Sequence, residues 1–158
     1  MLFLVFTLGS DRFALAARCV VEVLPLLELK QLPRAPHGVV GVFNYRGRPV
    51  PAVDLSVLAL GLPAQERLST RIIVINYADA AGVNHLLGLI AEHATGTMRK
   101  DAVDFADTGL RIRAAPYLGP ILMDPGGAVQ WIDERRLLPE PASTWLFAEV
   151  VSVANEKN

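Results

Sequence analysis

Few side chains in this chain of 158 residues could do acid–base or metal chemistry, and they are scattered. His37, His85 and His93 lack metal-ligand spacing to a cysteine or a carboxylate, so we interpret them as ordinary surface or loop histidines. The carboxylate pairs have the sequence context of loops and caps; they are Asp101 with Asp104 and Asp133 with Glu134. Because no nucleophile, base and oxyanion-binding group come together, we expect no enzyme activity, no metal and no cofactor.

The composition argues against several classes of partner and location. The net charge is −1 and no basic block occurs, which argues against nucleic acid, since phosphate binding relies on clustered Lys and Arg. The most apolar window, residues 72–91, carries four polar residues near its middle, so we expect no membrane insertion. The single cysteine, Cys19, and an N-terminus without signal-peptide features favour a cytoplasmic protein. The apolar fraction of 52% predicts a core together with patches for protein partners.

The stretch GVFNYRGRPVPAVDLS, residues 41–56, predicts two strands around a tight turn. Gly47 supplies the positive φ that such a turn often needs. Pro49 and Pro51 are two residues apart, so both missing N–H groups lie on the same side of the second strand. That strand should therefore lie at a sheet edge or carry a bulge, protected from random strand addition.

Two charged side chains in this hairpin have more than one interpretation. Asp54 closes the second strand, and we expect it to cap a helical turn that begins at Leu55 or Ser56. Arg46 precedes the turn and should project from the end of its lobe. It is either a solvated residue, paired with Asp54 or Glu22, or a contact to a binding partner, because arginine is enriched at binding hot spots.

Strand signals dominate the rest of the chain. We expect short helical turns at 56–63 and 134–139, residues 17–26 could be a helical turn that leads into a strand, and residues 142–153 are ambiguous. Residues 41–58 and 119–138 align as an internal repeat, each with a glycine, two strands around a glycine-containing turn, and an aspartate before a leucine-bearing turn. The hairpins that precede them also match at a similar offset.

The repeat predicts a mainly β protein of two small lobes. We place the lobes at roughly 10–66 and 70–138, with an N-terminal strand that both could share. Together they form one domain over 1–141, followed by an extension at 142–158. Apolar residues left over from two thin lobes should pack lobe against lobe.

Several stretches taken together resemble the CheW-like family of bacterial chemosensory adaptors. The family's Gly-Val-Ile-Asn-Leu-Arg-Gly and Val-Pro-x-x-Asp-Leu segments stand here as GVFNYRG and VPAVDL. The resemblance extends from residue 2 to residue 138; the other stretches that carry it are LVFTLGSDRFAL (4–15), VVEVL (20–24), LPRAPHGVVGV (32–42), LLGLIAEHATG (86–96) and YLGPILMDPGGAVQWIDERRLL (117–138).

The resemblance implies two five-stranded SH3-like barrels with short helices and no catalysis. It implies an adaptor that couples the cytoplasmic tip of methyl-accepting chemoreceptors to the regulatory domain of a CheA-type histidine kinase, recruited to receptor clusters. Gly41 would lie in a strand near a partner-binding surface. The positions that would line a receptor-binding groove between the lobes are Val20, Glu22, Arg46, Gly88 and Thr97.

Two other functions compete with the adaptor. One is a small-ligand-binding β domain that uses the groove between the lobes as its pocket. The other is a hydrolase with unrecognised carboxylates, which no residue pairing in the sequence favours.

Overall fold

The computed structural model describes residues 1–156, with side chains described as far as Val151. Strands dominate this part of the chain, which confirms the mainly β architecture; they are β1 Leu2–Leu8, β2 Asp11–Ala16, β3 Val20–Pro25, β4 Val39–Tyr45, β5 Arg48–Asp54, β6 Arg71–Ala78, β7 Asn84–Arg99, β8 Leu118–Asp124 and β9 Gly127–Ile132. The helical elements are α1 Leu55–Leu60, α2 Glu140–Glu156 and the 3-10 turns η1 Ala17–Cys19, η2 Ala102–Asp104 and η3 Glu134–Arg136. Neither α-helix of the described chain has the length and apolarity needed to cross a membrane.

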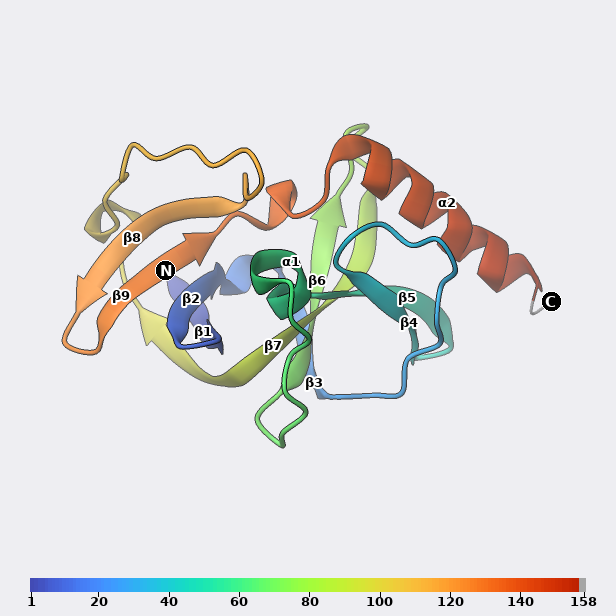
Figure 1. Cartoon of the computed structure of the whole chain (residues 1–158), viewed down its shortest axis with the longest axis horizontal. Coiled ribbons are helices and arrows are strands. Elements are labelled where there is room, and N and C mark those ends of the chain that lie inside the picture. Colours follow the sequence, from blue (N-terminus) through green and yellow to red (C-terminus); the bar gives the residue numbers. More distant parts are fainter. Residues whose placement is uncertain (157–158) are drawn as a thin grey trace.

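The strands form two five-stranded sets that share β7. Lobe 1 has the order β3-β6-β7-β5-β4 and uses residues 84–91 of β7. Lobe 2 has the order β7-β1-β2-β9-β8 and uses residues 92–99. In Figure 1, β8, β9, β1 and β2 lie on one side, β4 and β5 on the other, and β7 runs through both sets. A bulge at His93, whose φ is 49°, lies where β7 passes from one lobe to the other.

Each lobe closes into a ring through the segment that follows one of its strands. In lobe 1 the chain beyond β3 returns to β4, where Lys30 and Val42 exchange two backbone hydrogen bonds of 2.8 Å. In lobe 2 the chain beyond β7 returns to β8, where Ala106 and Ile121 exchange bonds of 2.8 and 2.9 Å. Ring closure satisfies edges that would otherwise stay unpaired, and it agrees with the small barrels that the resemblance implies.

The strand pairings divide the chain differently from the lobes expected at 10–66 and 70–138. Hairpin β1–β2 joins hairpin β8–β9, because β2 pairs in parallel with β9. Hairpin β4–β5 joins β6–β7, because β5 pairs in parallel with β7. Each repeat unit therefore gives one hairpin to each lobe. The cause is the 16-residue β7, which leaves its hairpin partner β6 in lobe 1 and pairs with β1 in lobe 2.

The two repeat units end alike, with an aspartate at a helical cap. The turn expected at 56–63 is α1, which is capped by Asp54 as predicted and ends at Gly61, whose φ is 73°. The helix expected at 134–139 is shorter, a 3-10 turn in which Asp133 accepts a hydrogen bond from the Arg135 amide at 3.1 Å.

The C-terminal segment is part of the packed structure. Residues 142–153, ambiguous from the sequence, are helical and belong to α2. The helix begins at Glu140, so the boundary expected after residue 141 falls inside it. The helix packs on the core; its buried apolar residues are Leu146, Phe147 and Val150.

Three clusters of buried apolar side chains hold the fold together. The interior of lobe 1 contains Phe43, Tyr45, Val50, Ala52, Ile72, Val74 and Ile90. The interior of lobe 2 contains Phe3, Ala14, Ala16, Phe105, Leu122 and Val129. A larger cluster between the lobes and α2 draws on both, and among its members are Leu4, Phe6, Leu15, Ile73, Ile75, Leu87, Leu89 and Ile132. This confirms the expectation that surplus apolar residues pack lobe against lobe.

Candidate functional site

The β4–β5 hairpin presents Arg46 at its tip. Arg46 and Gly47 have φ values of 51° and 82°, the two positive values of a two-residue type I′ turn, as predicted for Gly47. Asn44 supports the turn, because its Oδ1 accepts a hydrogen bond from the Gly47 amide at 2.8 Å. The backbone thus holds an arginine in a conformation that few side chains other than asparagine and aspartate adopt easily.

Neighbouring side chains hold the Arg46 guanidinium without covering it. Its Nη2 lies 3.2 Å from Oε1 of Glu22 on β3, which confirms one of the two pairings expected. Its Cζ lies 5.3 Å from the centre of the Tyr45 ring, within range of a cation–π contact. The neighbouring Glu22 carboxylate raises the pKa of the Tyr45 hydroxyl. The Arg46 side chain is nevertheless 73% exposed, so it is oriented and still available to a partner.

The two prolines lie on the half of β5 that only β4 contacts. β5 pairs with β7 through Ala52–Asp54, beyond both prolines. Tyr45 and Arg48 flank the two-residue turn, and residues in this position exchange two backbone hydrogen bonds with each other. Because the direction of the backbone groups alternates along a strand, the backbone nitrogens of Pro49 and Pro51 point away from β4. The expected edge is found only in the proline-bearing half of β5, because Ala52 and Val53 pair with both β4 and β7. Pro51 is buried, and the missing N–H groups prevent this side from adding a regular strand.

Gly41 and Gly88 lie where neighbouring segments approach the backbone closely. Both are buried in lobe 1. A Cβ at Gly88 would lie 2.5 Å from Cε1 of Phe43. A Cβ at Gly41 would lie 2.6 Å from the carbonyl oxygen of Lys30, in the segment that closes the ring. Through the strand register, both glycines lie in one row across the sheet with Glu22.

The remaining expected groove residues lie in different surroundings. Val20 is half-buried at the start of β3 and packs against the cluster between the lobes. Thr97 is exposed on the part of β7 that pairs with β1, so it belongs to lobe 2. The structure therefore brings Glu22 and Arg46 into contact, whereas Thr97 belongs to the other lobe.

Sequence reasoning missed two polar pairs. His85, interpreted as an ordinary histidine, lies with Nε2 2.8 Å from Oδ2 of Asp79 and stacks on Phe147 of α2 at 4.0 Å. This hydrogen bond lowers the pKa of Asp79. Arg12 and Asp124 join β2 to the β8–β9 turn through bonds of 2.7 and 2.9 Å, which lower the pKa of Asp124 to about 2. The second pair spans 112 residues, so no local pattern could reveal it.

The pockets do not support the alternative of a ligand-binding groove between the lobes. One pocket, of about 720 Å³, lies between residues 107–113 and strands β8 and β9. Others lie between α2 and the β6–β7 turn, about 560 Å³, and beside the β4–β5 turn, about 450 Å³. Between the lobes, packed apolar side chains fill the interface. Within residues 1–156, no three His, Cys, Asp or Glu side chains gather closely enough to hold a metal ion.

Comparison with known proteins identifies the family. The family model described as the CheW-like domain matches residues 2–142. The chain belongs to the CheW-like family. This agrees with the resemblance found from the hairpin and its neighbouring stretches.

Curated relatives of this CheW-like chain are chemotaxis proteins. The chemotaxis protein CheW of Helicobacter pylori is 27% identical over 103 residues, which cover 65% of this chain and 59% of that protein. The chemotaxis protein CheW of Klebsiella aerogenes is 30% identical over 96 residues, which cover 57% of this chain and 58% of that protein. The matched part thus spans about six-tenths of the length of these relatives.

A solved structure shows the same fold. The scaffolding protein TtCheW from Thermoanaerobacter tengcongensis superimposes with a TM-score of 0.76 over 89% of each chain, at 18% sequence identity. The architecture of two lobes and a shared long strand is therefore compatible with very different side chains in this family.

Proposed function

We propose that this protein is a non-catalytic adaptor that couples chemoreceptors to a CheA-type histidine kinase in a chemosensory pathway. The observation that carries the proposal is the CheW-like domain over residues 2–142. The curated relatives, which are chemotaxis proteins, support it as well. We expect the protein to act in the cytoplasm and to be recruited to receptor clusters.

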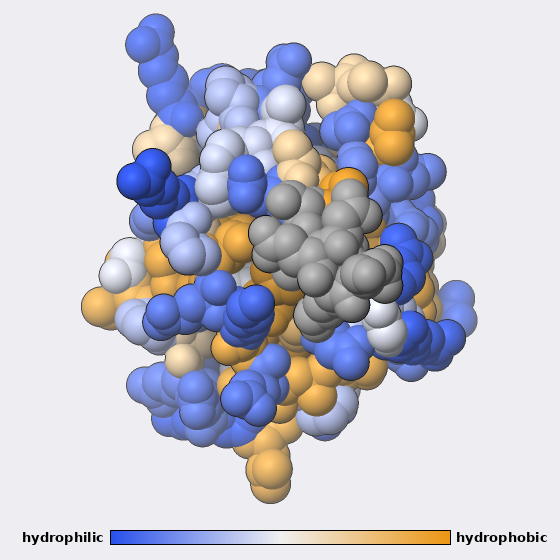
Figure 2. Space-filling view, turned by 90° about the vertical axis from the view of Figure 1, so that its right-hand side faces the viewer, coloured by the Kyte–Doolittle hydropathy of each residue, from blue (hydrophilic) through white to orange (hydrophobic). Residues whose placement is uncertain are grey.

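The Arg46 cluster gives the adaptor a defined contact point. An exposed guanidinium held by Glu22 and Tyr45 has already lost part of the side-chain freedom that binding would otherwise remove. Such an arginine can form bidentate bonds to a carboxylate of the partner. Figure 2 shows the end of the molecule that lies on the right of Figure 1, where hydrophobic and hydrophilic residues are mixed on the described surface. A mixed surface of this kind is typical of non-obligate protein interfaces.

Weak contacts suffice for this mechanism. A contact of micromolar affinity corresponds to about −8 kcal/mol. An adaptor that touches kinase and receptor together makes the second contact intramolecular, so the raised effective concentration stabilises the whole assembly. A movement of the receptor tip can then reach the kinase through the rigid pair of lobes.

The test is a binding measurement with the regulatory domain of a CheA-type kinase, with and without a receptor signalling tip. We expect capture of the kinase, strengthened by the tip. Arg46→Ala should weaken the receptor contact by about 1–3 kcal/mol, since it removes an exposed anchor. Its unfolding free energy should change by only about 0–1 kcal/mol, as for other exposed ion pairs.

Arg135→Ala is the matched control. Its side chain is 70% exposed and lies 3.0 Å from Asp133, so it has similar exposure and a similar ion pair on η3. Unchanged receptor binding by folded Arg46→Ala would reject the role of Arg46. Failure of the folded wild-type protein to bind any CheA-type kinase would reject the adaptor function itself.

A further inference from the structure

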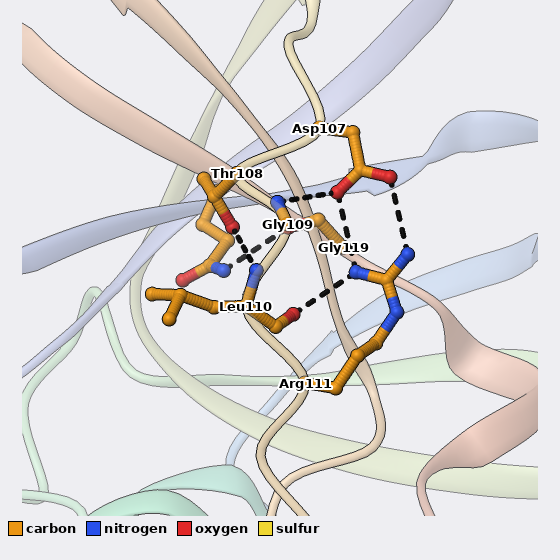
Figure 3. A network of polar contacts seen from close by, with 7 residues as sticks. Asp107, Thr108, Gly109, Leu110, Arg111 and Gly119 are labelled. Atoms are coloured by element: carbon orange, nitrogen blue, oxygen red, sulfur yellow. Dashed lines mark hydrogen bonds and ion pairs between the residues drawn. The ribbon is translucent and has the colours of Figure 1, made fainter.

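A long loop forms one wall of the pocket of about 720 Å³ beside β8 and β9. It follows η2 in lobe 2 and folds back over β8 and β9. Figure 3 shows that the loop has its own polar network. The two carboxylate oxygens of Asp107 accept bonds of 3.2 and 3.1 Å from Arg111, and Oδ1 also accepts one of 2.9 Å from the Gly109 amide. The wall is therefore a shaped segment with internal hydrogen bonds.

Arginines dominate the charge of this pocket. Its charged lining residues are Arg18, Arg111, Arg113, Arg135 and Arg136, together with the carboxylates Asp107, Asp133 and Glu134. Arg111 pairs with Asp107, and Arg135 and Arg136 both approach Asp133. Arg18 and Arg113 make no ion pair within the described part of the chain. Two exposed guanidiniums thus face the pocket with their hydrogen-bond donors available to an anion.

The same pocket has an apolar wall. Leu110 and Ile112 of the loop are 69% and 50% exposed, although both are large apolar residues. Leu118 and Ile121 of β8 line the pocket as well. Its volume of about 720 Å³ lies inside the usual range for small-molecule sites, about 300–1,000 Å³. The pocket could therefore hold a ligand that has both an apolar body and an anionic group.

We propose that this pocket binds a small organic phosphate of the nucleotide class. Guanidinium groups match phosphate oxygens in bidentate geometry, and their flat faces stack on aromatic rings. In this arrangement Arg18 and Arg113 hold the phosphates, while Leu110 and Ile112 cover one face of the base. The site lies on lobe 2, apart from the Arg46 cluster of lobe 1, so it is an addition to the adaptor function and does not depend on it.

Isothermal titration calorimetry of the full chain with GTP and with ATP tests the proposal. We expect at least one of the two to bind, whereas inorganic pyrophosphate and free guanosine, which each lack one half of the ligand, should bind far more weakly. Arg18→Ala and Arg113→Ala should each weaken binding by about tenfold, because each removes a charge-assisted contact. Arg99→Ala is the control, since Arg99 is also exposed but lies outside the pocket.

Three results would overturn the proposal. The first is that neither nucleotide binds at concentrations up to about 1 mM. The second is that the wild type and the Arg18→Ala/Arg113→Ala double variant bind nucleotide equally well. The third is that pyrophosphate binds as tightly as the nucleotides. Both arginines are on exposed turns, so thermal unfolding should confirm that the variants fold. Leu110→Ala, a change on the apolar wall that adds no charge, should weaken nucleotide binding and leave any pyrophosphate binding unchanged, and an unaffected nucleotide affinity in this variant would count against the site.

Discussion

Gly88→Ala should destabilise the protein although it adds only one methyl group. The new Cβ would lie 2.5 Å from Cε1 and 2.8 Å from Cζ of Phe43, and 3.0 Å from Cγ2 of Ile72. Ordinary van der Waals contact begins at 3.4 Å, so the Phe43 ring would have to move by roughly an ångström. Phe43 and Ile72 are both buried in the interior of lobe 1, which leaves the ring little room to move.

The expected cost is about 1–3 kcal/mol of unfolding free energy, the range for overpacking a well-packed core. For a domain of this size, each kcal/mol lowers the melting temperature by about 2–4 °C. Phe43→Leu makes room for the methyl group, so Phe43→Leu and Gly88→Ala should be less destabilising together than the sum of the two single changes. We expect a coupling of about 0.5–3 kcal/mol from a double-mutant cycle.

Gly96→Ala on the same strand is the control for this experiment. Nothing lies within 4 Å of a Cβ built at Gly96, and its φ is not in the positive range. Alanine there should be neutral or stabilise by up to about 1 kcal/mol, because glycine loses more backbone freedom on folding. Urea denaturation measures all the variants. A Gly88→Ala protein as stable as Gly96→Ala, or additive single changes at Gly88 and Phe43, would refute the packing role of Gly88.

Two further outcomes follow from the polar contacts of the fold. Asp54→Ala should lower the unfolding free energy, measured by urea denaturation, by about 1–3 kcal/mol, because the carboxylate accepts hydrogen bonds from the amides of Ser56 and Ala64. Asp54→Asn keeps one acceptor and should lower it by less. Equal losses in the two variants would contradict the capping role. The hydrogen bonds from Arg12 lower the pKa of Asp124 to about 2 from its ordinary value of 3.8. Their contribution to stability is therefore complete above pH 3.8 and is lost as the pH falls through about 2. The unfolding free energy of the wild type should therefore exceed that of Asp124→Asn by about 1–2 kcal/mol near neutral pH, and the difference should disappear only below about pH 2. A difference that stays constant over this range would refute the assignment.

Local patterns were enough to predict the hairpin at the candidate site. Gly47 in the tight turn and the proline-marked edge of β5 follow from backbone rules that act within a few residues. Asp54 at the start of α1 and Gly61 at its end follow from the same kind of rule. The contact between Arg46 and Glu22 could only be offered as one of two pairings, because it joins residues 24 positions apart.

The role of Gly88 could not be predicted from its neighbours along the chain. Its environment consists of Phe43 from β4 and Ile72 from β6, which the strand register brings to it. The same holds for His85, whose stacking partner Phe147 lies in a helix that the sequence left ambiguous. In each case the physical cause is packing between segments distant in sequence.

The sequence by itself determined the turns, the caps, the alternation of hairpins and the repeat of two similar units. These features depend on φ preferences, side-chain capping and local hydrophobic pattern. Only the tertiary structure decided which hairpins pair. Similar hairpins offer similar backbone edges, so the local pattern does not distinguish one partner from another. The choice is made by β7, whose residues 84–91 lie in lobe 1 and whose residues 92–99 lie in lobe 2, so that the two units interlock around one buried interface.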